Sequence, residues 1–203
     1  MADIKLIIVG YGVIGKSLIQ TIQSKEKEFK EKGFGLKIVG VCELEGSLAD
    51  QDGLELTSII NCDFKSHKKY VEKNTLEVMD DLEADVLVEC TPGDIKTGEP
   101  GLSHIKKAFS NGMHVVTSNK SPLAVAYSEL TDLASKKDCM FRFEATVGGA
   151  IPVLGLKDSA LTANKISNIY GVLNGTTNYV LHKMASEGVD LELALREAQE
   201  LGY

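Results

Sequence analysis

The segment from residue 10 to residue 15 is the first place where residue types and spacing indicate chemistry. It fits the pattern G-x-G-x-x-G and lies between an apolar run and a helical stretch, a context typical of dinucleotide-binding loops. In such loops the glycines allow a tight turn and the close approach of a pyrophosphate, and the helix N-terminus attracts the anion. We therefore predict cofactor contacts from Gly10, Tyr11, Gly12, Val13, Ile14 and Gly15.

Glu43 bears on the choice between NAD and NADP. It follows the second apolar run, where dinucleotide-binding domains place an acidic residue that binds the ribose hydroxyls. A carboxylate at this position repels a 2′-phosphate, which favours NAD. The lysines at positions 65, 68 and 69 are able to reach back toward the ribose, so NADP stays open as an alternative.

Two further segments at the ends of expected strands indicate a reaction centre. Thr91 and Pro92 follow the third apolar run and are expected beside the nicotinamide, because open α/β sheets bind ligands at their strand ends. Ser118, Asn119 and Lys120 lie where a later strand meets a helix. A lysine with a lowered pKa at such a position can relay the proton of a substrate hydroxyl, or stabilise charge during hydride transfer.

Two polar segments lie further along the chain. Residues 144–152 are rich in turn residues, and the main-chain carbonyls of such a turn can bind a hard monovalent cation. A helix start at residues 174–178 offers amides, hydroxyls and N–H groups to an amino-acid substrate. Phosphorylating aldehyde dehydrogenases have a cysteine before a similar Thr-Thr-Asn run, but Gly175 stands there in this chain, which disfavours acyl-enzyme chemistry. The substrate-binding residues we predict are Asn174, Gly175, Thr176 and Thr177, together with Lys120.

These segments need a scaffold that brings strand ends together. Apolar runs alternate with helical stretches as far as about residue 150, which is typical of a parallel sheet covered on both faces. The strands we expect are 4–9, 36–42, 85–90, 114–117 and 140–145. The helices we expect are 13–30, 100–111 and 122–136. Beyond residue 150 we expect a strand at 165–173 and helices at 176–185 and 191–201.

The predicted fold class is therefore α/β, with a Rossmann-type parallel sheet in the first domain. This dinucleotide-binding domain is expected over residues 1–150. Residues 151–203 are expected to begin an α+β substrate and dimerisation domain. One strand and two helices are a poor independent core, so this second domain is incomplete in the sequence.

Composition excludes several other classes of protein. The 203 residues include 22 basic and 29 acidic side chains, a net charge of −7, and no basic stretch that a nucleic-acid binder would show. No apolar run approaches the roughly 18 residues of a membrane span, and no signal peptide is visible at the start. The four cysteines form no C-x-x-C pair and are expected to be reduced thiols. These features favour a cytoplasmic protein that acts on a small molecule.

Four segments, taken in order after the glycine loop, resemble the homoserine dehydrogenase family. They are IKTGEP at 95–100, TSNKSPLA at 117–124, EATVGGAIP at 144–152 and GVLNGTTNY at 171–179. The resemblance runs from Gly10 to the last residue. It implies an NAD(P)-dependent enzyme that interconverts L-homoserine and L-aspartate 4-semialdehyde, in threonine, methionine and isoleucine biosynthesis.

The resemblance also implies roles for individual residues. Lys120 matches the catalytic lysine of the family, with Asn119 and Ser118 positioning it or the nicotinamide. The family has a sodium-type site made of main-chain oxygens. The corresponding residues here are Glu144, Val147, Gly149 and Ile151.

The sequence departs from the family at its end. The family continues beyond the residues that match 201–203, with an acidic substrate-binding segment, an aspartate and a second lysine that this sequence lacks. We therefore expect the natural protein to be a homodimeric enzyme and the 203-residue piece to be inactive. Two other interpretations stay open, a non-catalytic NAD-binding sensor and an aldehyde dehydrogenase of related fold.

Overall fold

The computed structural model describes residues 2–202, which divide into two compact units. The first ends at Thr146 and the second begins at Val147. The assignment of cofactor and substrate roles to residues 1–150 and 151–203 stays a prediction.

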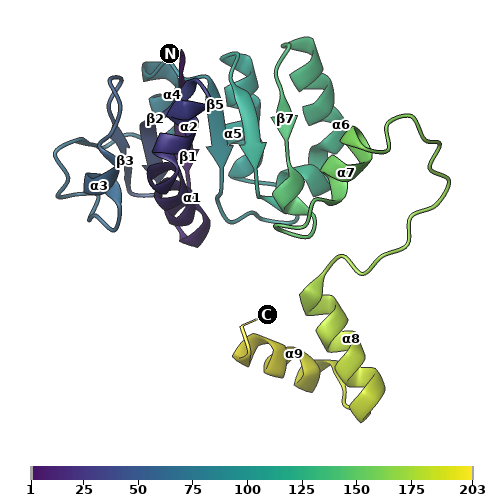
Figure 1. Ribbon diagram of the computed structural model, residues 1–203. Helices are drawn as coiled ribbons and strands as arrows, with labels where there is room; N and C mark the ends of the chain where they lie inside the picture. The colour runs from purple at the N-terminus through teal and green to yellow at the C-terminus, as the bar shows by residue number, and fades with distance from the viewer. Residues whose placement is uncertain (1, 203) are drawn as a thin grey trace. The chain divides into compact units, whose positions relative to one another are not determined.

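A seven-stranded sheet forms the first unit, with the strand order β4-β3-β2-β1-β5-β6-β7 (Figure 1). Neighbouring strands from β2 to β7 along this order are parallel, as predicted, and β1 is the central strand of the seven. Strand β3 pairs antiparallel with β2 on one side and with the edge strand β4 on the other, so the sheet is mixed rather than purely parallel. The strands are β1 (Ala2–Val9), β2 (Phe34–Glu43), β3 (Gly46–Ala49), β4 (Tyr70–Val71), β5 (Val86–Glu89), β6 (His114–Thr117) and β7 (Phe141–Arg142).

Helices follow most of the strands and cover both faces of the sheet. Those of the first unit are α1 (Val13–Ser24), α2 (Glu26–Glu31), α3 (Leu56–Ile59), α4 (Thr75–Asp81), α5 (Gly101–Ser110) and α6 (Lys120–Lys136), with a 3₁₀ turn at Glu144–Thr146. The single helix predicted over 13–30 is in fact two, because the chain leaves helical geometry at Lys25. Helix α6 begins at Lys120, two residues before the predicted start, since Pro122 fits within a first turn that needs no N–H from it.

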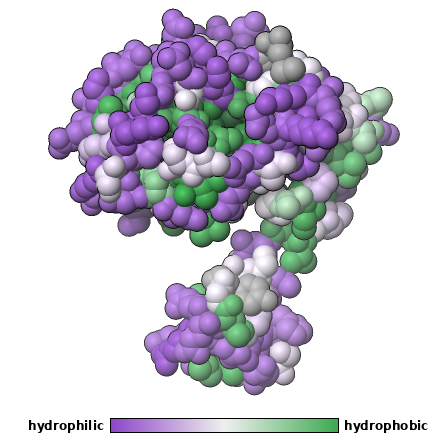
Figure 2. Space-filling model, turned by 60° about the vertical axis from the view of Figure 1, so that its left-hand side comes forward, coloured by the Kyte–Doolittle hydropathy of each residue, from purple (hydrophilic) through white to green (hydrophobic). Residues whose placement is uncertain are grey.

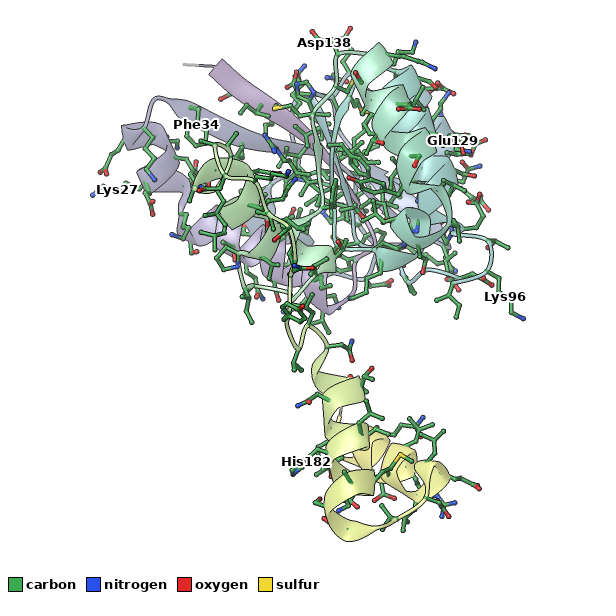
Figure 3. All side chains as sticks on the ribbon, turned by 90° about the vertical axis from the view of Figure 1, so that its right-hand side faces the viewer. Lys27, Phe34, Lys96, Glu129, Asp138 and His182 are labelled. Atoms are coloured by element: carbon green, nitrogen blue, oxygen red, sulfur yellow. The ribbon has the colours of Figure 1, made fainter. Side chains whose placement is uncertain are left out.

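The core consists of two apolar layers, one on each side of the sheet. Alternate residues of β1 point into the two layers. Ile7 lies in the layer under α4, α5 and α6, and Ile8 lies in the layer under α1. Both side chains are completely buried. An ion pair of 2.7 Å between Lys106 on α5 and Glu129, which is labelled on α6 in Figure 3, joins two of the covering helices at the surface.

The second unit contains α7 (Val153–Ser159), α8 (Gly175–Glu187) and α9 (Leu191–Glu200). Helices α8 and α9 pack together through Val180, Ala194 and Ala198. The strand predicted at 165–173 is wrong, because these residues have no regular structure. A strand needs a neighbour for its N–H and C=O groups, and within the described part of this unit no other strand is present.

The surface of the first unit is mainly hydrophilic. Hydrophilic residues cover most of the face of the first unit that Figure 2 shows. None of the helices within residues 2–202 combines the length and the apolar character that a membrane span requires.

Candidate functional site

Four parallel strands end side by side at one edge of the sheet, and the predicted cofactor residues follow them directly. The register pairs Val9 with both Cys42 and Glu89, and Glu89 with Thr117. Main-chain hydrogen bonds continue past the strands, for Gly10 N donates to the Cys42 carbonyl at 2.9 Å. The structure therefore brings the glycine loop and the turns after β2, β5 and β6 to one place, as expected of a ligand site in an open α/β sheet.

The glycines of the loop meet three different demands. Gly10 has a φ of 93°, and a Cβ there lies 2.8 Å from the Cys90 carbonyl. A Cβ at Gly15 lies only 2.1 Å from the Gly10 oxygen, so this glycine lets α1 approach the loop. A Cβ at Gly12 meets nothing within 4 Å. The free space at Gly12 is what a ligand in contact with the loop requires.

The N-terminus of α1 has the features of an anion site. No side chain caps the helix at Gly12, and its first turn contains no acidic residue. The first N–H groups of the helix are thus left for a ligand, and the helix dipole favours a negative one. Val13 and Ile14 in this turn are 85% and 54% exposed, unusual positions for large apolar side chains. These residues fit the pyrophosphate of a dinucleotide.

Tyr11 contributes to the loop through its main chain rather than its ring. Its side chain is buried, and the hydroxyl donates to the Ile59 carbonyl and accepts from the amide of Asn61 at 2.7 Å. Burial raises the pKa of this phenol above its usual value. The Tyr11 amide donates to a carboxylate oxygen of Glu43. Glu43, the residue predicted to bind the ribose hydroxyls, thus contacts the glycine loop.

Two of the lysines considered for a 2′-phosphate have carboxylate partners. Lys65 pairs with Glu45 at 2.6 Å, and Lys69 pairs with Asp50 at 2.7 Å. Hydrogen bonding to Lys65 lowers the pKa of the Glu45 carboxyl, while the same pair raises the pKa of Lys65. Binding of a 2′-phosphate by either lysine therefore competes with an existing ion pair.

A buried polar network, which sequence reasoning missed, lies between the ends of β5 and β6. Its centre is Glu89, whose side chain has no exposed surface. One carboxylate oxygen accepts from the amide of Thr91 at 3.0 Å and from the hydroxyl of the same residue. The other accepts from the Thr117 hydroxyl at 3.0 Å. The signal in the sequence was a carboxylate at the end of an otherwise apolar strand.

His104 on α5 lies beside this network. Its Nδ1 atom is buried 4.0 Å from a Glu89 carboxylate oxygen, beyond hydrogen-bond distance, and has no hydrogen-bond partner among the described residues. The loop before α5 extends outward from the same edge of the sheet. Figure 3 shows its residue Lys96 pointing away from the body of the unit.

Lys120 follows the network directly and is the first residue of α6. Asn119 is the N-cap of this helix, and its side-chain oxygen accepts from the Ser121 amide at 3.1 Å. Asn119 is buried, whereas Lys120 is exposed. No ion pair within residues 2–202 involves Lys120. Its amine is therefore free to meet a ligand, while the residue before it is fixed. Pro92, expected beside the nicotinamide, is exposed at the same edge.

The predicted substrate residues lie in the second unit, at the start of α8. Asn174 is the N-cap of this helix, and its side-chain oxygen accepts from the Thr177 amide at 2.7 Å. A Cβ at Gly175 meets nothing within 4 Å. Thr176 lies in the same first turn. Their contact with a substrate stays a prediction.

The predicted cation ligands lie on both sides of the division between the units. Glu144 belongs to the first unit, while Val147, Gly149 and Ile151 belong to the second. The turn contains two successive glycines with positive φ, and the Ile151 carbonyl accepts from the Val153 amide at 2.9 Å. A carbonyl oxygen has a second lone pair, so this bond leaves room for a cation. The four oxygens as one ligand set stay a prediction.

Comparison with protein families gives two adjoining matches. Residues 10–144 match the family model for the NAD-binding domain of homoserine dehydrogenase, and residues 152–203 match the model for homoserine dehydrogenase itself. A homoserine dehydrogenase of Methanocaldococcus jannaschii is 44% identical over 97% of this chain. An NAD(+)-dependent homoserine dehydrogenase of Pseudomonas canavaninivorans is 36% identical over the whole chain. The chain spans 60% of the length of each of these relatives.

Solved structures agree with the sequence relatives. The crystal structure of homoserine dehydrogenase from Thermoplasma acidophilum has a TM-score of 0.80 at 29% identity, over 98% of this chain and 60% of that one. A hyperthermophilic archaeal homoserine dehydrogenase in complex with NADPH has a TM-score of 0.78 at 27% identity, over 98% of this chain and 61% of that one.

Proposed function

Because this chain belongs to the homoserine dehydrogenase family, we propose that the protein interconverts L-homoserine and L-aspartate 4-semialdehyde. One observation carries the proposal. An open glycine loop and the exposed, unpaired amine of Lys120 follow strands that end at the same edge of one sheet. A dehydrogenase needs both features, one to hold a dinucleotide and the other to handle the proton of the hydroxyl group.

The chemistry divides between the cofactor and the chain. NAD or NADP, when bound, accepts a hydride from the hydroxyl-bearing carbon of homoserine and returns it in the reverse reaction. In the oxidation the O–H and adjacent C–H bonds break and a C=O bond forms. The amine of Lys120 holds the departing hydroxyl proton or stabilises the charge on that oxygen. Asn119, Ser118, Thr91 and Pro92 orient the reacting groups.

We propose that the start of α8 binds the amino-acid end of the substrate. Asn174, Gly175, Thr176 and Thr177 offer an amide, hydroxyls and helix N–H groups to the substrate carboxylate and amine. We further propose that main-chain oxygens of Glu144, Val147, Gly149 and Ile151 bind a sodium-type cation. The remaining parts of the proposal are that the enzyme is homodimeric and cytoplasmic.

Cofactor preference follows from Glu43. Its carboxylate accepts from the Tyr11 amide, which places a negative charge against the glycine loop. A negative charge there repels the 2′-phosphate of NADP, so we propose a preference for NAD. Relatives of both kinds exist, one described as NAD(+)-dependent and one solved with NADPH.

The test is a pair of assays on the natural full-length protein. Oxidation of L-homoserine by NAD(P)⁺ should produce the reduced cofactor, measured by its absorbance. L-aspartate 4-semialdehyde with phosphate and NAD(P)⁺ should produce none, because Gly175 provides no thiol for an acyl-enzyme. Reduction of the cofactor in the second assay alone is the result that overturns the proposal in favour of an aldehyde dehydrogenase.

A further inference from the structure

The carboxylate of Glu89 is an unusual group to find buried in a protein core. Its side chain is fully buried, and no lysine or arginine within residues 2–202 forms an ion pair with it. Burying a carboxylate is unfavourable unless hydrogen bonds compensate for lost hydration. Glu89 receives three such bonds, all from the two threonines that end or follow β5 and β6. The burial of this charge is unfavourable in itself, and the network lies next to Asn119 and Lys120 of the proposed reaction centre.

The carboxylate fixes the direction of both threonine hydroxyls. An ionised carboxylate only accepts, so the Thr91 and Thr117 hydroxyls must donate their hydrogens to Glu89. The lone pairs of both hydroxyls then face Asn119. The main-chain amide of Asn119 donates to Thr117 Oγ1 at 3.0 Å, and its side-chain amide lies 3.5 Å from Thr91 Oγ1.

Packing leaves Asn119 little freedom to turn away from the two hydroxyls. A Cβ at Gly93 lies 2.3 Å from its Oδ1 atom, and a Cβ at Gly101 lies 2.7 Å from its Nδ2 atom. Gly93, in the loop after β5, and Gly101, the first residue of α5, therefore both lie close against the side-chain amide of Asn119. The same Oδ1 atom accepts a hydrogen bond from the Ser121 amide and so caps the N-terminus of α6. Lys120 is the first residue of this helix.

We propose that Glu89 is a positioning residue, which acts through Thr117 and Thr91 to hold Asn119 and so to fix Lys120 at the reaction centre. The inference rests on the proposed function for the role of Lys120, but the network itself does not. Glu89 touches neither substrate nor cofactor in this account. Its effect is on the geometry of the proton-handling group, where small displacements cost much of the rate.

The test compares two substitutions at Thr117 in the full-length protein. Thr117→Ser keeps the hydroxyl, and Thr117→Val removes it at nearly constant volume. We expect Thr117→Val to lower kcat for L-homoserine by at least about tenfold, with cofactor affinity within about threefold of the original, and Thr117→Ser to keep most of kcat. Thr131→Val is the matched control, because that hydroxyl donates only to carbonyls of its own helix. Thermal melts confirm that each variant is folded.

A second measurement does not depend on turnover. Hydrogen exchange at the Asn119 main-chain amide, followed by NMR, reports its bond to Thr117 directly. We expect Thr117→Val and Glu89→Gln to speed this exchange by at least about fivefold relative to the core amide of Val39. If the original protein does not oxidise homoserine, the proposed function is wrong. The exchange rate at Asn119 still shows whether Glu89 and Thr117 hold this amide. Unchanged exchange at Asn119, or a folded Thr117→Val variant with full kcat, overturns the inference.

Discussion

The main-chain amide of Tyr11 donates a hydrogen bond to the carboxylate of Glu43, across the gap between the ends of β1 and β2. This bond ties the acidic residue to the glycine loop, although 32 positions separate the two in sequence. The negative charge of Glu43 is therefore held beside the place where the loop receives a dinucleotide. If Glu43 selects the cofactor as proposed, the same contact also holds the glycine loop.

The first prediction concerns coenzyme choice. Glu43→Gln keeps the acceptor oxygen for the Tyr11 amide but removes the negative charge, so affinity for NADP should rise relative to NAD. Isothermal titration with both cofactors measures the ratio. Glu31→Gln on α2, which also removes one carboxylate, should leave the ratio unchanged. An unaltered ratio in Glu43→Gln means that the carboxylate does not face the 2′ position.

Gly12→Val tests the loop without disturbing the fold. A Cβ at this position meets no atom within 4 Å, and the backbone φ of −78° is open to any residue. The melting temperature should stay the same, while a branched side chain blocks the phosphates and weakens cofactor binding by at least tenfold, about 1.4 kcal/mol. Calorimetry that finds equal affinity in this variant shows that the pyrophosphate lies elsewhere.

Gly15→Ala, unlike Gly12→Val, should lower the stability of the protein. Its Cβ lies 2.1 Å from the Gly10 carbonyl oxygen, a main-chain atom that is unable to move without shifting the loop or the helix. We expect a loss of stability of about 2 kcal/mol or more, measured by urea denaturation. A variant as stable as the original protein contradicts the close packing of α1 on the loop.

The scaffold was largely predictable because its signals are local. The apolar runs and the glycine loop identify β1, β2, β5 and β6, and parallel pairing then brings their ends together. Strands β3 (GSLA) and β4 (YV) were missed because neither contains an apolar run like those of β5 and β6. The strand expected at 165–173 has the right apolar residues, but a strand forms only beside another strand.

The network around Glu89 was not predicted, whereas Lys120 and Asn119 were named as site residues, and their roles stay predictions. Glu89 and Thr117 are 28 positions apart, and only the register of β5 against β6 makes them neighbours. Nothing in the residues after an apolar strand distinguishes a buried carboxylate from an exposed one at the exit of a turn. The link from Glu89 to Asn119 through the hydroxyls of Thr91 and Thr117 depends on packing that the sequence does not show.

The buried thiol of Cys42 gives a prediction for alkaline pH. Burial raises its pKa to about 11 in the folded protein, above the value of about 8.5 for an exposed thiol. The thiol is protonated in both states below the lower value, so its full contribution to stability is present there. Between the two values only the unfolded chain releases the proton, and stability falls as pH rises toward 11.

Urea denaturation from neutral to alkaline pH measures this fall. Cys42→Ser has no thiol to ionise, so its stability should decline less steeply over the same range. Cys139→Ser is the control, because that thiol is only partly buried and should contribute less to the slope. Identical slopes for Cys42→Ser and the original protein contradict the burial of this thiol.

The most direct test of the account is the turnover of Lys120→Ala in the full-length protein with L-homoserine. The amine of Lys120 is exposed at the first position of α6, and Lys136→Ala at the other end of that helix is the matched control. We predict that Lys120→Ala lowers kcat by about several hundredfold and leaves cofactor affinity nearly unchanged, while Lys136→Ala keeps both. A Lys120→Ala enzyme with native kcat contradicts the assignment of this lysine to the reaction.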